Sequence, residues 1–233
     1  MKLILSFISI LLSVLMVEIW LRIIDFDYNP NPNWRFDSKL GWTQEKGQEY
    51  KVQIQDREVV IEFNSSGFRD REHTYQKPDG TRRLVILGDS FSEAVQVNLE
   101  KTYWYRLKEL LNRDSSEPWE VINLGVGDFG QAQAWLALTE HGFRFSPDLV
   151  ISQVFPLNDI CNNSIELLGL CKSTNDRYRP YFKETSDGNL VIVHGQPIRH
   201  FLRSHSFVFG VIEKSVLSFQ EWLRTGISWG QTR

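Results

Sequence analysis

The sequence predicts an α/β domain built on a parallel sheet, carried behind an N-terminal membrane helix. Two observations predict this class. Short, continuous apolar stretches alternate with helix-forming stretches through the middle of the chain, and residues 3–17 hold no charge. Strands of a parallel sheet are covered on both faces, so they are apolar throughout. The 233 residues suffice for one such domain and are too few for two.

The first 26 residues predict a transmembrane or signal-anchor segment. Leu3–Ile24 reaches the roughly 20 residues needed to cross the hydrocarbon layer only by including Glu18 and Arg22. These two are four residues apart and can pair on one helix face. A cleaved signal peptide is the alternative, but no small-x-small cleavage site follows. Lys2 ahead of the segment favours an exported domain, periplasmic or extracytoplasmic.

A linker is predicted at 27–47, where Pro30 and Pro32 stand among asparagines and oppose a helix. The soluble domain is expected at 48–233, and it begins with a small hairpin around Asp56.

The centre of the chain repeats a strand-then-helix order. Ligands bind at the carboxyl ends of such strands. After the third strand no further parallel strand follows, which would leave an edge unpaired, so we expect the C-terminal part of the fold to be missing. The predicted elements are strands at 84–87, 121–124 and 149–155, helices at 101–112, 131–141 and 207–223, and a hairpin around 187–188.

Composition excludes some partners. With 26 Lys and Arg against 29 Asp and Glu, the chain has no basic excess to attract nucleic acid. Two cysteines cannot make a zinc site alone. Cys161 and Cys171 suit a disulfide in an oxidising compartment, and two free buried thiols remain the alternative.

Ser90 is the candidate nucleophile. It follows a predicted strand directly in Gly88-Asp89-Ser90, where the glycine permits a sharp turn and a close approach of backbone to substrate. Alone, these three residues also suit an ordinary turn or a helix N-cap.

The sequence around Ser90 resembles the SGNH (GDSL-type) ester hydrolase family, in particular its membrane-anchored, exported members. The resemblance covers roughly residues 60–210 and implies a flavodoxin-like three-layer α/β/α fold and the hydrolysis or transfer of an acyl ester. The matching blocks are Asn64-Ser65-Ser66-Gly67-Phe68-Arg69-Asp70-Arg71-Glu72, Arg83-Leu84-Val85-Ile86-Leu87-Gly88-Asp89-Ser90-Phe91, Val121-Ile122-Asn123-Leu124-Gly125-Val126, Pro147-Asp148-Leu149-Val150 and Asn158-Asp159.

The resemblance implies roles for single residues. Ser90 attacks the ester carbonyl, and its backbone N–H and the Asn158 amide bind the oxyanion. A glycine N–H serves as third donor in the family, but that position holds Asp128 here, so Asp128 or Gly127 could donate. Pro156 departs from the family pattern, because it stands where the family has a glycine. The same motifs also imply residues that support the site. The supporting residues are Gly88, Asp89 and Asp159.

The sequence offers no clear catalytic base for Ser90. A serine hydroxyl needs a histidine to take its proton, and in the family an Asp-x-x-His pair near the C-terminus supplies it. No histidine of this chain is assigned to such a pair, so we expect an incomplete chain with little turnover. The histidines are His73, His141, His194, His200 and His205.

The resemblance therefore implies an esterase or deacetylase that acts outside the cytoplasm, on an envelope polysaccharide or lipid. An O-acyltransferase, in which a sugar hydroxyl replaces water, and a binding protein that lost its base are the alternatives. Ester attack by a serine needs no metal, so we expect neither a metal nor another cofactor.

Overall fold

A computed structural model describes residues 2–24, 34–167, 178–194 and 196–225 of the chain. The chain forms two compact units. One comprises residues 37–195, and the other comprises residues 1–36 together with 196–233. The two are described separately.

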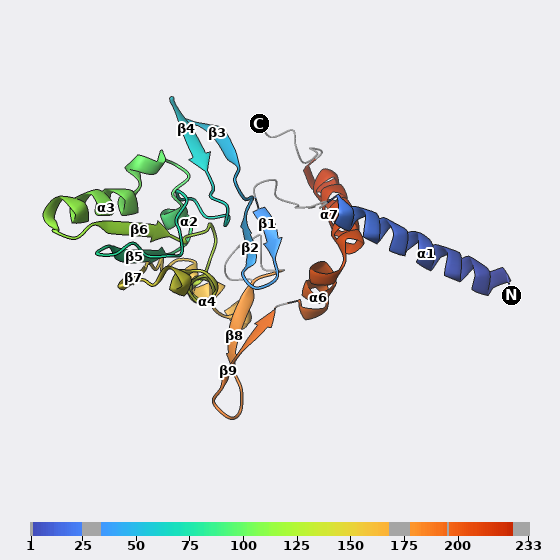
Figure 1. The fold of residues 1–233 in the computed structure, drawn as a ribbon. Helices are drawn as coiled ribbons and strands as arrows, with labels where there is room; N and C mark the ends of the chain where they lie inside the picture. The colour runs from blue at the N-terminus through green and yellow to red at the C-terminus, as the bar shows by residue number, and fades with distance from the viewer. Residues whose placement is uncertain (1, 25–33, 168–177, 195, 226–233) are drawn as a thin grey trace. The chain divides into compact units, whose positions relative to one another are not determined.

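The larger unit is mixed α/β and centres on a three-stranded parallel sheet. Its strands are β5 (Arg82–Leu87), β6 (Trp119–Asn123) and β7 (Leu149–Ser152), in the order β6-β5-β7 (Figure 1). The central strand β5 is buried from Arg83 to Leu87, which matches the continuous apolar stretch of the sequence. The parallel sheet predicted from the strand-then-helix order is thus confirmed.

Helices cover both faces of this sheet. Leu84 and Ile86 of β5 pack with Trp104 of α3 (Tyr103–Asp114). The residues between them point to the other face, where α4 (Gln131–Glu140) contacts β5 (Figure 1). Thr102 is the N-cap of α3, and its hydroxyl accepts a hydrogen bond from the Tyr105 N–H at 3.3 Å.

Two antiparallel hairpins flank the sheet in sequence and confirm the predicted ones. The first pairs β3 (Glu49–Ile54) with β4 (Arg57–Glu62), and the second pairs β8 (Pro180–Glu184) with β9 (Leu190–His194). Short elements complete the unit. They are β2 (Gly41–Gln44), α2 (Ser90–Glu93), η1 (Leu99–Lys101), η2 (Gly142–Phe145), α5 (Asp159–Asn162) and η3 (Ile165–Leu167).

The buried guanidinium of Arg83 fixes the amino end of β5. It pairs with Glu120 at 2.7 Å and donates to the backbone oxygens of Tyr75 and Phe145 at 3.0 and 2.8 Å. A buried charge is tolerated because its donors are satisfied in this way. The segment before β5 is thereby tied to the start of the sheet, which leaves the opposite, carboxyl edge to carry the site.

The smaller unit contains α1 (Lys2–Ile23), α6 (Pro197–His205) and α7 (Phe207–Thr225), and β1 (Trp34–Asp37) begins within it. In α1, Ile4–Ile23 is long and apolar enough to cross a membrane, and a signal sequence near an N-terminus has the same properties. The predicted apolar helix is therefore present.

Glu18 joins α1 to the start of α7. Its carboxylate accepts hydrogen bonds from the Phe207 and Val208 N–H groups at 3.0 and 2.9 Å. It also pairs with Arg22 at 2.8 Å, as predicted from their spacing. Helix α7 thus groups with α1, whereas the sequence placed residues 48–233 in one domain. Helix α6 was not predicted.

Candidate functional site

The three strand ends meet at one edge of the sheet, as expected. In register, Ile86 of β5 lies opposite Asn123 of β6, and Leu87 lies opposite Ser152 of β7. The chain leaves β5 for β6 on one side and then crosses to β7 on the other. Such a reversal opens a crevice beyond the carboxyl ends of the strands, where ligands of α/β sheets bind.

Ser90 stands at this edge of the sheet, directly after the central strand. It is the first residue of the short helix α2, and the Asp89 carboxylate caps the helix by accepting the Phe91 N–H at 2.9 Å. Ser90 is half-buried. In the described part of the chain no hydrogen bond engages its side-chain oxygen, so the hydroxyl can meet a ligand.

The hydroxyl of Ser92, two residues after Ser90, is by contrast buried and hydrogen-bonded. Ser92 is fully buried, and its hydroxyl lies 2.7 Å from the Tyr103 hydroxyl and 3.2 Å from Gln153 Oε1. Two glycines make room for it, because a Cβ at Gly88 or Gly125 would overlap the Ser92 side chain. The Gly-Asp-Ser glycine is required here by close packing.

Asn158 and Asp159 come from the loop after β7, on the other side of the crevice. Asn158 is half-buried and stands directly ahead of α5. Asp159 closes the loop on itself by accepting the Phe155 N–H at 2.8 Å. The Phe155 ring in turn lies 4.7 Å from the ring of Phe91, so the loop with Asn158 contacts the turn with Ser90.

Two carboxyl groups line the same edge. Burial raises the pKa of Asp89, and the negative charge of Asp159 raises it further. Burial also raises the pKa of Asp159, while hydrogen bonds from Phe155 and Gln131 oppose that rise. Both side chains act on backbone and neighbouring polar groups, which suits the supporting roles predicted for them.

Asp128 adopts a left-handed backbone with φ +65°, a conformation that favours glycine. A glycine, which the resemblance implied at this position, would adopt this conformation without strain. The Asp128 carboxylate lies 3.0 Å from the buried guanidinium of Arg179 and 3.3 Å from the Asn162 amide. Its charge is therefore neutralised by Arg179.

The loop that holds Gly127 and Asp128 is fixed from several directions. Arg179 donates to the Asp128 carbonyl at 2.7 Å, and Trp42 Nε1 donates to the Gly127 carbonyl at 3.1 Å. The Gly127 backbone also bonds to the carboxyl group of Glu93. That Gly127 amide is thus engaged within the protein.

Glu93 lies fully buried at the end of α2, the helix that begins with Ser90. Gln44 donates to its carboxyl group. Burial raises the pKa of Glu93 to about 7, and the hydrogen bonds from Gln44 and Gly127 and the charge of Arg69 oppose the rise. One buried group therefore connects the Ser90 helix to the Gly127 loop.

No histidine of the described residues hydrogen-bonds to Ser90. The interpretation that left every histidine outside an Asp-x-x-His pair is wrong, because Asp70 and His73 have this spacing, with His73 Nε2 3.2 Å from Asp70 Oδ2. The pair precedes the first sheet strand instead of lying near the C-terminus. The His73 ring packs against Phe145, and Asp70 also accepts a hydrogen bond from the Asn123 N–H at 2.7 Å. In the described residues no hydrogen bond joins this pair to Ser90.

The predicted disulfide is only partly within the described residues. Cys161 is disulfide-bonded, and Cys171 lies outside the part of the chain that the structure describes. Their pairing stays a prediction. No group of three or more His, Cys, Asp or Glu side chains in the described ranges is arranged to hold a metal ion.

Four residues of the site were missed by sequence reasoning. Trp42, Gln44 and Arg179 are far from Ser90 in sequence and belong to no motif, so only the fold brings them to the Gly127 loop. Glu93 follows Ser90 by three residues, and an acidic residue amid buried neighbours is the signal that could have found it.

No protein-family model and no curated protein matches this chain in sequence.

Proposed function

We propose that the chain is a serine ester hydrolase of the SGNH type that cleaves acyl or acetyl esters outside the cytoplasm. One observation carries the proposal: Ser90 follows the central strand at the point where the strand order reverses, and Asn158 follows the adjacent strand. The substrate class, an acylated envelope polysaccharide or lipid, rests on the apolar helix α1 and the family resemblance.

In the proposed reaction the Ser90 hydroxyl oxygen attacks the ester carbonyl, and its proton passes to an acceptor. The C–O bond to the alcohol then breaks, the alcohol leaves with a proton, and water hydrolyses the acyl-serine. The Ser90 N–H, the Asn158 amide and the Asp128 N–H would stabilise the oxyanion. The rigid Gly127 loop supports this role because fixed donors need no reorganisation during the reaction.

A second candidate function is binding of an acyl ester without turnover. It is favoured by the lack of a histidine hydrogen-bonded to Ser90 in the described residues, since an unassisted serine is a weak nucleophile.

Hydrolysis of a chromogenic acetyl ester by the full chain tests the proposal. We expect slow, measurable release of the chromophore that falls to the uncatalysed rate in Ser90→Ala. Ser92→Ala is the matched control, because its hydroxyl is buried and engaged by Tyr103, and it should keep most of the activity.

Two results would count against the proposal. Activity that persists in Ser90→Ala would place the nucleophile elsewhere. Tight, saturable binding of an ester without any Ser90-dependent release would favour the binding protein.

A further inference from the structure

Helix α6 turns its apolar side chains outward. Ile198, Phe201 and Leu202 lie at a spacing that puts them on one helix face, and their exposed fractions are 78%, 59% and 37%. A helix on the surface of a soluble protein has the opposite arrangement, with its apolar face toward the core.

Two basic side chains of α6 contact α7. Arg199 pairs with the buried Glu213 of α7, and Arg203 packs so closely on α7 that a side chain at Gly210 would overlap its guanidinium. Charged groups therefore hold the two helices together within this unit. The exposed apolar side chains of α6 are not covered by these contacts.

Helix α7 also exposes apolar side chains. Ile212, Val216 and Phe219 recur at intervals of four and three residues, and each is about half exposed or more. These residues and Ile198, Phe201 and Leu202 are called the apolar surface of the smaller unit. Two successive helices of this unit thus each expose a row of large apolar side chains.

The contacts of Glu18 and Arg22 place this surface at the end of the membrane helix. Glu18 accepts the first N–H groups of α7, and Arg22 donates to the carbonyl of His205, the last residue of α6, at 2.6 Å. From Leu3 to Glu18 a helix rises about 22 Å at about 1.5 Å per residue. In a hydrocarbon layer of about 30 Å, the junction of α6 and α7 then lies near its boundary.

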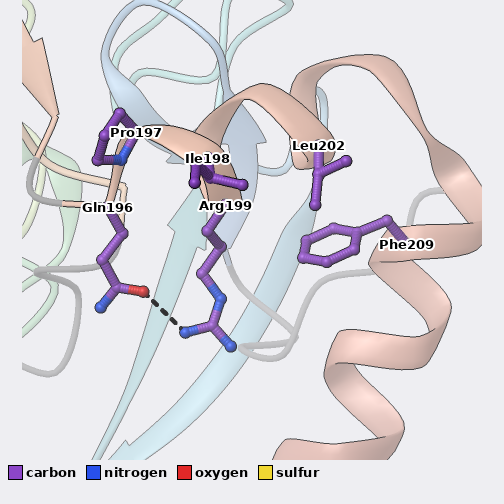
Figure 2. Close-up of a pocket in the computed structure, with 6 residues that line it drawn as sticks. All are labelled: Gln196, Pro197, Ile198, Arg199, Leu202 and Phe209. Carbon is purple, nitrogen blue, oxygen red and sulfur yellow. Dashed lines mark hydrogen bonds between the residues drawn. The ribbon is translucent and has the colours of Figure 1, made fainter.

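A hollow between α6 and α7 adds to the apolar surface. Figure 2 shows Leu202 and Phe209 directed toward one another, with Ile198 and Pro197 along the same rim. Arg199 and Gln196 lie at its polar side and are hydrogen-bonded to each other at 2.9 Å. Because Arg199 is already paired with Glu213, the hollow offers mainly its apolar walls, which suit a lipid acyl chain.

We propose that α6 and the exposed stripe of α7 lie on the lipid bilayer that α1 enters, with their apolar side chains among the acyl chains beneath the headgroups. The chain then touches the membrane through two elements, one that crosses it and one that lies along it. This inference does not depend on the proposed esterase activity.

The test uses the full chain reconstituted in vesicles of phosphatidylcholine and phosphatidylglycerol. A fluorophore is attached at Phe201→Cys, and its quenching by lipids with a doxyl group high on the acyl chain is compared with quenching by aqueous iodide. Val14→Cys, in the middle of α1, is the positive control for insertion. Ile198→Cys repeats the measurement should the first variant fold poorly.

We expect strong doxyl quenching and weak iodide quenching at position 201. Strong iodide quenching would mean that the face is in water, and a label that neither reagent reaches would mean that protein covers it, either the larger unit or a second copy. Each of these two results would overturn the proposal.

Discussion

Gly125 has no room for a side chain because the buried Ser92 packs against it. We expect Gly125→Ala to lower the free energy of unfolding by about 1–3 kcal/mol, the usual cost of overpacking. Urea unfolding measures this, and Ser92→Gly in the same chain should recover part of the loss. Equal losses in the single and double variants would show that the two positions are independent.

Glu93 predicts a pH dependence of stability. Its pKa is raised by burial from 4.5 to about 7, so the folded chain keeps a proton that the unfolded chain releases between these values. Stability from this group is therefore full below pH 4.5 and declines as pH rises to about 7. We expect the melting temperature to fall from pH 5 to pH 8.

Glu93→Gln is the control for that decline, because its amide does not titrate. The melting temperature of this variant should fall less over the same range, with a remainder from Asp89 and Asp159, whose pKa values are also raised. An identical pH profile in both proteins would contradict the assignment.

At this scale the sequence revealed the residues that belong to a motif, including Asp89 and Asp159 that hold their own loops, and none of the supporting residues that lie far away in sequence. Ser90 and Asn158 were found because they follow strands within recognisable blocks. Arg179 and Trp42 were not, since their importance comes from contacts across more than 45 residues of chain.

At the scale of elements, the ion pair between the buried Arg179 and the partly buried Asp128 is one of the contacts that fix the Gly127 loop. Removing Arg179 leaves a partly exposed carboxylate without its partner, so the cost should fall below the roughly 3–5 kcal/mol of a fully buried pair, at about 2–3 kcal/mol. We expect a loss of this order in Arg179→Met, measured by urea unfolding. Adding Asp128→Asn should restore part of it, and a double variant no more stable than the single one would contradict the pairing.

Glu18 of α1 also joins two elements, because its carboxylate accepts hydrogen bonds from the first N–H groups of α7 and so caps that helix. We expect Glu18→Ala to cost about 1 kcal/mol, as for loss of an N-cap. Hydrogen exchange in detergent micelles should then be faster at the amides of Phe207 and Val208. Unchanged exchange at both would show that the carboxylate does not hold the helix start.

The periodicity of the sequence predicted most elements well, because continuous apolar strands and turn signals such as Asp187-Gly188 are local properties. Helix α6 was missed although Ile198, Phe201 and Leu202 recur at helical spacing, because its nine residues show that spacing only once. So short a stretch gives a weak periodic signal.

At the scale of the whole molecule, the separation into two units was not predictable from composition. Helix α7 follows the larger unit in sequence, whereas its contacts, including the hydrogen bonds from its first amides to Glu18, group it with α1. Sequence reasoning grouped it with its neighbours along the chain. Long-range hydrogen bonds of single charged residues leave no periodic signal.

The central claim is that the edge beyond β5 and β7 presents Ser90 as a nucleophile. Its most direct test is mass spectrometry of the full chain after treatment with an excess of a serine-directed phosphonate. We predict a covalent adduct on the peptide that contains Ser90. A chain without an adduct, or with the adduct on another serine, would contradict the claim.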